Sequence, residues 1–166
     1  ALTCAIMPVV GCGGGGVEKN KTQLYIGNYN QGFGQAWLDA AAKRFEEQYA
    51  DVSFEKGKTG VQVVIEDVEV SNNLYQSIEN SRSEVIFNEM ADYFQWAKSG
   101  KVLDITDVVS GENASLEKYG DAAGVTIESK MYDSAIDYYR YENKYYGVPF
   151  YETYIGIMSD VDMWAE

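Results

Sequence analysis

The chain has 166 residues, of which 46% are hydrophobic, and this amount of apolar material is sufficient to bury a core. Its 13 basic and 26 acidic residues give a net charge of −13, which disfavours nucleic acid or an anionic lipid surface as a partner. Histidine is absent, so the side chain that most often acts as general base or metal ligand is missing from any catalytic hypothesis.

The first twelve residues are apolar and uncharged, and they end in Val9-Val10-Gly11-Cys12. This run is too short to cross a bilayer as a helix, but it is typical of the hydrophobic part and cleavage site of a signal peptide that lacks its basic start. Val9–Cys12 resembles the lipobox of bacterial lipoproteins, which implies acylation of Cys12. The glycines 13–16 are then expected to form a flexible tether. An ordinary terminus with an incidental cysteine is the alternative.

An alternation of strand and helix patterns begins after this leader. Leu24–Ile26 is a short β-prone run, and the glycine- and asparagine-rich segment 27–34 indicates a loop. Apolar residues at helical spacing then predict an amphipathic helix over 35–49. Its expected buried face consists of Leu38, Ala41, Ala42, Phe45 and Tyr49. Val61–Ile65 predicts a second strand after the turn-rich loop 51–60, and this order indicates a parallel crossover.

The same alternation continues in the middle of the chain. Residues 72–80 have helical spacing, and 84–87 predicts a third short strand that is buried. A helix is expected over 93–98, and Gly100 is expected to end it. The stretch 102–107 contains an aspartate and a threonine that suit the cap of another short turn.

The last third of the sequence is rich in tyrosine. We expect a helix over 127–136, in which the inward residues are Met131, Ala135 and Ile136. Two aromatic β-prone runs, 138–141 and 144–148, flank Glu142-Asn143 and therefore predict a hairpin. Residues 154–158 predict a final strand.

Four stretches, in this order, resemble the bacterial extracellular solute-binding proteins of the maltose-binding type, family 1. They are the first strand, loop and helix start from Leu24, the strand Glu84–Phe87, the stretch Ala97–Asp107, and Asn143–Pro149 with Gly156–Trp164. The third stretch is the most specific, because it resembles the family's pattern of a small residue, glycine, leucine, aspartate, leucine, threonine and aspartate. In the fourth, Ser159-Asp160 replaces the more usual Tyr-Asn.

The resemblance covers about residues 22–166. It implies an α/β fold, namely a periplasmic-binding-protein-like type II lobe with a doubly wound sheet and helices on both faces. Members of the family are longer and hold two lobes, so this chain is expected to stop before most of the second. We expect a signal peptide remnant, lipobox and tether over 1–21, the first lobe over 22–149, and a hinge crossing with the start of the second lobe over 150–166.

The function implied by the resemblance is capture of a solute between two lobes and its delivery to the permease subunits of an ABC importer. Hinge closure on the solute would create the closed form that the permease recognises. The protein would be extracytoplasmic, anchored to the outer face of the cell membrane through its lipid only. Since binding needs no chemistry, we expect no catalytic residue, no metal and no cofactor.

A carbohydrate, as a mono- or oligosaccharide, is the expected solute, because amides and carboxylates suit sugar hydroxyls and aromatic faces stack on pyranose rings. Loops at the carboxyl ends of strands face the crevice in open α/β sheets. The candidate ligand-binding residues after the first and third strands are Tyr29, Asn30, Gln31, Phe33, Asn88, Glu89 and Tyr93. The resemblance implies further candidates in the hinge crossing after Pro149, namely Tyr151, Glu152 and Tyr154. Loop packing, turn formation and helix capping are their structural alternatives. Trp37 and Trp96 are interpreted as core or helix-face residues.

Two other functions are kept as hypotheses. The same fold could bind a peptide, a polyamine, a phosphate ester or a metal-organic anion. The loops after the first and third strands lack basic residues, which disfavours anions, whereas Glu89 and Glu152 could meet an ammonium group, so a polyamine is the second hypothesis. A lipid-anchored glycoside hydrolase would need two paired carboxylates, and no such pair stands in a pattern typical of barrel strand ends.

Overall fold

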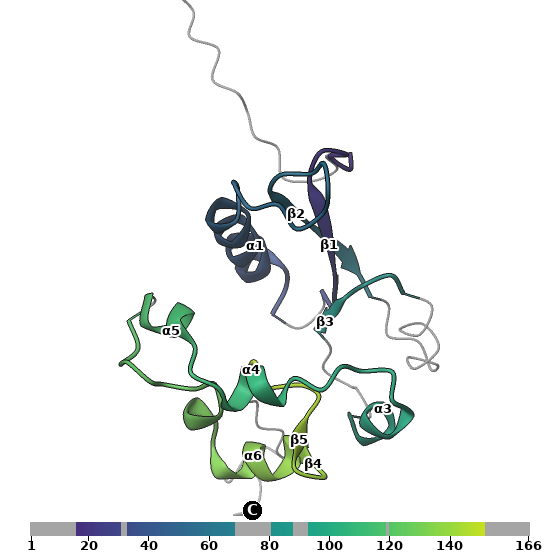
Figure 1. The fold of residues 1–166 in the computed structure, drawn as a ribbon. Helices are drawn as coiled ribbons and strands as arrows, with labels where there is room; N and C mark the ends of the chain where they lie inside the picture. The colour runs from purple at the N-terminus through teal and green to yellow at the C-terminus, as the bar shows by residue number, and fades with distance from the viewer. Residues whose placement is uncertain (1–15, 31–32, 69–80, 88–92, 119, 152–166) are drawn as a thin grey trace, which may run out of the picture. The chain divides into compact units, whose positions relative to one another are not determined.

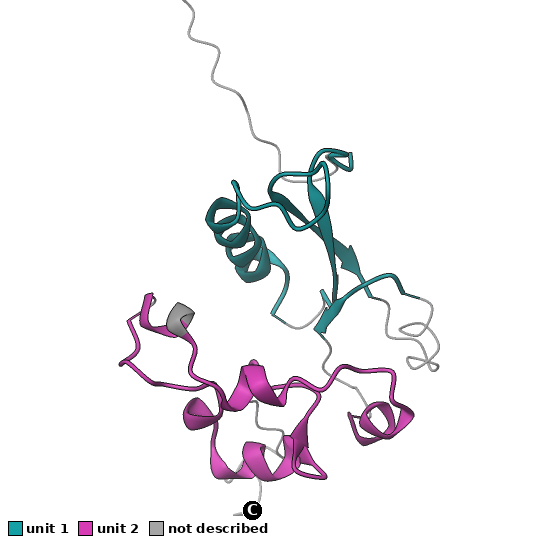
Figure 2. Cartoon of the chain, viewed as in Figure 1, with its two compact units in different colours: residues 1–91 teal, residues 92–166 magenta. Residues whose placement is uncertain are grey.

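The computed structural model describes residues 16–30, 33–68, 81–87, 93–118 and 120–151. The chain divides into two compact units, residues 1–91 and 92–166, which Figure 2 shows in different colours. The lobe expected over 22–149 therefore contains parts of both units, and its boundaries stay a prediction. The helix expected over 72–80, the strand expected over 154–158, and most of the leader lie outside the described residues.

Unit 1 is built on a parallel sheet of three strands, β1 (Thr22–Asn28), β2 (Val61–Asp67) and β3 (Val85–Phe87) (Figure 1). Their order is β2-β1-β3, so β1 is the central strand. It pairs with β2 along its whole length and with β3 over its last three residues. The three strands and the parallel crossover predicted from the sequence are confirmed.

The central strand is closely covered on one side, and Gly27 shows this. A Cβ atom on Gly27 would lie 2.6 Å from Cγ2 of Val68 and 3.1 Å from Oγ of Ser83. Any larger residue at this position would therefore require the side chains of Val68 and Ser83 to move. The predicted loop over 27–34 consequently begins later, since β1 continues through Asn28.

Helix α1 (Ala36–Gln48) lies beside β2 and confirms the predicted amphipathic helix (Figure 1). Leu38 is the buried residue of its inner face, with 3% of its surface exposed. Phe45 was expected on the same face but is 36% exposed. Its ring contacts Tyr49, and Tyr49 in turn contacts Phe54 in the following loop. These rings form a small cluster at the end of α1, where Phe45 is only partly covered.

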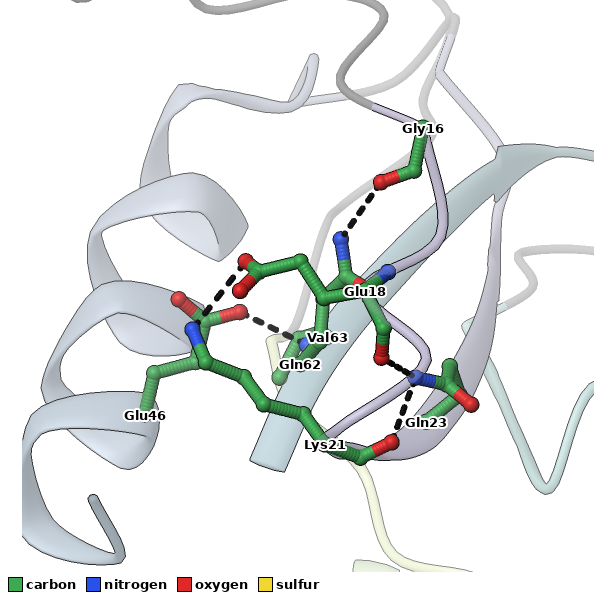
Figure 3. Close-up of polar contacts among 7 residues, drawn as sticks. All are labelled: Gly16, Glu18, Lys21, Gln23, Glu46, Gln62 and Val63. Carbon is green, nitrogen blue, oxygen red and sulfur yellow. Dashed lines mark hydrogen bonds and ion pairs between the residues drawn. The ribbon is translucent and has the colours of Figure 1, made fainter. Parts of the chain in front are cut away.

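Glutamate side chains accept bonds from two backbone N–H groups of the sheet, one on the edge strand β2 and one on the central strand β1. At the β2 edge, the N–H of Val63 donates to Oε1 of Glu46 in α1 at 2.7 Å (Figure 3). On the β3 side, the N–H of Tyr25 donates to Oε2 of Glu84 at 2.7 Å, just before β3 begins. A buried or half-buried backbone donor without a partner is costly, so these carboxylates stabilise the sheet where no strand is paired.

Strand β3 is not buried as predicted. Val85 is 41% exposed, and Ile86 and Phe87 are half-buried. In the described sheet β3 is an edge strand of three residues, so it covers β1 on one side only. An apolar run of this length cannot by itself distinguish a central from an edge strand.

Unit 2 consists of short helices followed by a hairpin (Figure 1). The elements are α3 (Tyr93–Ser99), α4 (Thr106–Ser110), α5 (Ala114–Lys118), the 3₁₀ turn η1 (Glu128–Lys130), α6 (Asp133–Tyr139), β4 (Arg140–Tyr141) and β5 (Lys144–Tyr145). Helix α3 ends at the predicted glycine, because Gly100 has a φ of +67°, which disfavours residues with a side chain.

Tyr145 holds the middle of unit 2 together. Its side chain is 1% exposed, and its hydroxyl donates to Oε1 of Glu128 at 2.9 Å. Its backbone N–H donates to Oγ1 of Thr106, and its carbonyl accepts from the N–H of Ile105 at 2.8 Å. Burial, with the bond to Glu128, raises the pKa of Tyr145 to about 12. One residue of the hairpin thus ties η1 and the start of α4 to β5.

Tyr93 forms a second junction in this unit. It is 7% exposed, its hydroxyl donates to the carbonyl of Tyr139 at 2.6 Å, and it accepts from the N–H of Tyr146 at 2.9 Å. Its ring lies 5.0 Å from that of Tyr139 and 5.7 Å from that of Phe94. Edge-on contacts of this kind stabilise aromatic pairs beyond the burial of their area.

Two predictions in the last third of the chain are corrected. The single helix expected over 127–136 is divided into η1 and α6, because the backbone is extended at Met131 and Tyr132. Reciprocal bonds between Thr126 and Ser129 close η1 into a short turn. The hairpin and its turn at Glu142-Asn143 are confirmed, with φ values of 50° and 64°, but its strands are shorter than predicted. Residues 138–139 belong to α6 instead.

The predicted cap residue is not the N-cap of α4, which is Ile105, but the aspartate just before it, Asp104. Its Oδ1 accepts from the backbone N–H of Thr106 at 3.1 Å and from its hydroxyl at 2.6 Å, and its Oδ2 lies 3.0 Å from Nζ of Lys144. The hydrogen bond from the Thr106 hydroxyl, followed by that from Lys144, lowers the pKa of Asp104 from 3.8 to about 2. The ionised carboxylate therefore joins the start of α4 to the hairpin.

We expect this carboxylate to stabilise the folded state above pH 3.8, and to lose that contribution as the pH falls through about 2. Asp104→Asn should lower the urea midpoint of unfolding at pH 7 and 5, and the difference from the parent should vanish between pH 4 and 2. Circular dichroism measures both. Asp137→Asn, at an exposed position of α6, is the matched control. A difference that stays constant down to pH 2 would contradict the role of the Asp104 charge.

Candidate functional site

The carboxyl ends of the three parallel strands meet at one end of unit 1. Strand β1 ends at Asn28, β2 at Asp67 and β3 at Phe87. Backbone bonds continue past these ends, since the N–H of Tyr29 donates to the carbonyl of Phe87 at 3.1 Å and the N–H of Val68 donates to that of Asn28 at 2.9 Å. The segment after β1 is thereby attached to the ends of both neighbouring strands.

The loop between β1 and α1 is fixed at Gly34. The carbonyl of Gly34 accepts a bond from Nε1 of Trp37 at 3.1 Å and a longer one from Nδ2 of Asn28 at 3.4 Å. Gly34 has a φ of +68°, a conformation that favours glycine. The ring of Trp37 lies edge-on to Phe87, with centroids 5.0 Å apart. The loop is therefore held by the central strand, by α1 and by β3.

Three predicted ligand contacts of this loop are described. Tyr29 is half-buried, Asn30 is exposed, and Phe33 is 64% exposed. The loop thus presents an amide and an aromatic ring to solvent beside a partly covered phenol. These groups could bind hydroxyls and stack on an apolar ring face. Their role in ligand binding stays a prediction.

Two other predicted contacts belong to unit 2. Tyr93 lies at the start of α3 and is buried, and both of its described hydroxyl bonds go to backbone groups of residues 139 and 146. Tyr151 is half-buried, and its ring lies 4.5 Å from that of Phe150. A structural role is evident for Tyr93, and a ligand role for either tyrosine stays a prediction. Gln31, Asn88, Glu89, Glu152 and Tyr154 lie outside the described residues, as does Cys12.

Asn28 is a feature of this end of the sheet that the sequence-based candidates did not include. It is 2% exposed and is the last residue of the central strand. No sequence signal marked it, because Asn28 directly follows Gly27 in the glycine- and asparagine-rich segment that was expected to be a loop. Trp37, interpreted as a helix-face residue, does pack on Phe87 and also binds the loop carbonyl.

Charged groups near the described strand ends are mostly acidic or paired. Arg82 donates to Glu66 through Nε at 3.0 Å, and its guanidinium lies 4.1 Å from the ring centroid of Tyr25. The bond from Arg82 lowers the pKa of Glu66. Within the ranges that the structure describes, no cluster of three cysteine or acidic side chains could hold a metal ion. No helix in those ranges is long and apolar enough to cross a membrane.

Comparison with known families decides what this arrangement belongs to. The pattern described as bacterial extracellular solute-binding protein matches residues 15–166, which is most of the chain. The chain belongs to this family. The search of curated proteins found no match. Membership confirms the resemblance found in the sequence and accounts for the mixed α/β fold with a parallel sheet.

The family assignment fixes the general role of this solute-binding protein. It indicates extracellular solute binding for ABC transport, with a small molecule as ligand and permease subunits as partners. In open α/β sheets the ligand lies beyond the carboxyl ends of the strands. The Asn28–Gly34–Trp37 arrangement occupies such a place in unit 1.

The bond from Trp37 to Gly34 is testable without a ligand. Trp37→Phe keeps a ring beside Phe87 but removes the indole N–H, so we expect a loss of about 1 kcal/mol in stability and faster amide exchange in the loop after β1. Hydrogen exchange followed by mass spectrometry measures this. Trp96→Phe is the matched control, because no bond from the Trp96 indole to another described residue is present. Equal exchange in the two variants would contradict this role.

Proposed function

We propose that this solute-binding protein captures a carbohydrate and delivers it to an ABC import permease, without catalysing a reaction. The observation that carries the proposal is the loop between β1 and α1. It combines an exposed amide, Asn30, with an exposed ring, Phe33, beside the half-buried ring of Tyr29. Amides can donate to one hydroxyl and accept from another, and aromatic faces cover the C–H side of a sugar.

The attachment of this loop at both of its ends supports the proposal. Side chains bind more tightly when their positions are set before the ligand arrives, since less conformational freedom is lost on binding. The bonds from Trp37 and Asn28 to Gly34 hold the carboxyl-terminal end of the loop, and the Tyr29 bond to Phe87 holds its start. A loop attached at both ends, with a solvent-facing amide at Asn30 and a ring at Phe33, suits a neutral polyol.

A polyamine is the second candidate, because the chain carries a net charge of −13 and the loop after β1 has no basic residue. An ammonium ligand would require carboxylates at the site, and Glu89 and Glu152 are the residues that could supply them. A hydrolase is less well supported, since the family consists of binding proteins and the candidate loop after β1 contains no carboxylate.

The ligand class can be tested by thermal melting of the full-length protein with mono- and oligosaccharides, putrescine and spermidine. A bound ligand raises the melting temperature by mass action, by an amount equivalent to about 2.7 kcal/mol at a hundredfold excess over Kd. We expect a rise with a sugar, and Asn30→Ala should weaken that sugar about tenfold by loss of hydroxyl contacts. Asn20→Ala, at an exposed position in a turn, is the control.

Each other outcome of this experiment has a definite meaning. A rise with polyamines alone would keep the family and overturn the carbohydrate. Release of new reducing ends from an oligosaccharide would overturn the absence of catalysis. If a sugar binds equally to the parent and to the Asn30→Ala protein, the loop after β1 does not contact it through this amide.

We further propose that Cys12 carries the lipid that anchors the protein to the outer face of the cell membrane. The sequence Val9–Cys12 supports this, because a small residue precedes the cysteine at the end of an uncharged apolar run. A lipid anchor would keep the binding protein near its permease.

Metabolic labelling of the full-length protein with an alkyne-bearing fatty acid in a bacterial host tests this attachment. Cys12→Ala should abolish the label and move the protein from the membrane to the soluble fraction, because it removes the acylated sulfur. Cys4→Ala is the matched control and should retain the label. A label that persists in the Cys12→Ala protein would exclude Cys12 as the attachment site.

A further inference from the structure

Two glutamines hold the segment that precedes β1. Gln23 in β1 and Gln62 in β2 are paired in the parallel register, so their side chains project from the same face of the sheet. The carboxamide of Gln62 accepts from the N–H of Glu18 at 2.8 Å and donates to the carbonyl of Gly16 at 3.4 Å. The amide of Gln23 donates to the carbonyls of Glu18 at 2.7 Å and Lys21 at 2.6 Å. Figure 3 shows these bonds converging on residues 16–21.

We call this pair the glutamine clamp. Its two side chains form hydrogen bonds with the backbone of residues 16–21, as a neighbouring strand would. A carboxamide carries a donor and an acceptor like a peptide group, so Gln62 can satisfy one N–H and one carbonyl of a passing backbone. Further bonds close the same segment. Lys21 donates to the carbonyl of Glu18 through its N–H, and Thr59 donates to the carbonyl of Asn20 at 2.9 Å. Residues 16–21 are therefore attached to the amino ends of β1 and β2.

The position of the clamp limits how far the folded unit can lie from an anchored Cys12. From Cys12 to Gly16 there are four residue steps, which span at most ~14 Å in any conformation. The strands run away from the clamp, and a strand of seven residues extends about 20 Å. The clamp and the candidate ligand loop thus lie at opposite ends of the same sheet.

Charge distinguishes the clamp end from the rest of the chain. Residues 16–21 and the adjoining loop 51–60 carry four lysines and three acidic residues, whereas the whole chain carries a net charge of −13. Lys21 and Lys58 are paired with Glu18 and Glu55. An anionic bilayer would therefore repel this end less than the charge of the whole chain suggests.

We propose that the amino end of the sheet in unit 1, formed by residues 16–21 and 51–60, is the surface that faces the lipid bilayer, and that the glutamine clamp holds this end next to the anchored Cys12. The inference rests on the proposed lipid attachment at Cys12. It places the candidate ligand loop on the end of unit 1 that is remote from the anchor.

The first test is tryptic cleavage of the full-length protein after Lys19 and Lys21. A protease needs its substrate segment to leave the folded surface, so the clamp should slow this cleavage. Gln62→Ala and Gln23→Ala should each accelerate it about tenfold, as expected from the loss of two hydrogen bonds. Gln48→Ala, at the exposed end of α1, is the matched control. Unchanged cleavage in both clamp variants would overturn the clamp.

The second test measures orientation on vesicles. The full-length protein with Cys4→Ser is coupled through Cys12 to a maleimide lipid in phosphatidylcholine vesicles with 30% phosphatidylglycerol. A donor dye on an azide-bearing residue at position 56 or 36 reports energy transfer to a lipid-bound acceptor. We expect more transfer from position 56, and Gln62→Ala should reduce the difference. Equal transfer from both positions in the parent would overturn the orientation. Chemical coupling makes this result independent of acylation in cells and of the ligand.

Discussion

The hydrogen bonding of β1 on both of its edges is the constraint on which unit 1 depends. Parallel pairing with β2 and β3 brings the chain back to the same end of the sheet after each strand, so the ends at Asn28, Asp67 and Phe87 become neighbours. This pairing determines where the loop after β1 begins. Gly34 then receives bonds from the central strand and from α1, which attach the end of this loop to both elements.

The fold of unit 2 is stabilised by a different kind of contact. Its helices are short, and isolated helices of such length are unstable in water. Buried tyrosines replace long-range sheet pairing here, because each provides a large apolar ring and a hydroxyl that can bind a distant group. Tyr145 binds Glu128, and Tyr93 binds the backbone at Tyr139 and Tyr146. The tyrosine-rich composition of the last third of the chain thus has a structural explanation that is separate from ligand binding.

The sequence predicted what depends on local pattern. The spacing of Leu38 and its neighbours gave α1, the β-branched run at Val61 gave β2, and Glu142-Asn143 gave the hairpin turn. It failed at Phe45, whose ring contacts Tyr49 and stays partly exposed, and at Met131, where the turn closed by Thr126 and Ser129 ends in extended backbone. Residue spacing alone indicates neither how completely a side chain is covered nor where a helical turn stops. The candidate loop was predictable from its place after β1. The role of Asn28 was not, because a buried amide is recognised only when its partner, the Gly34 carbonyl, is known.

The bond between Glu46 and the N–H of Val63 has a consequence for folding after export. The residues of β2 are rich in valine and isoleucine, and such a strand can pair with another copy of itself while its edge is open. Once α1 docks, the Glu46 carboxylate occupies a donor that a foreign strand would need. Protection against self-association is therefore coupled to the docking of α1, and it is lost whenever that helix detaches.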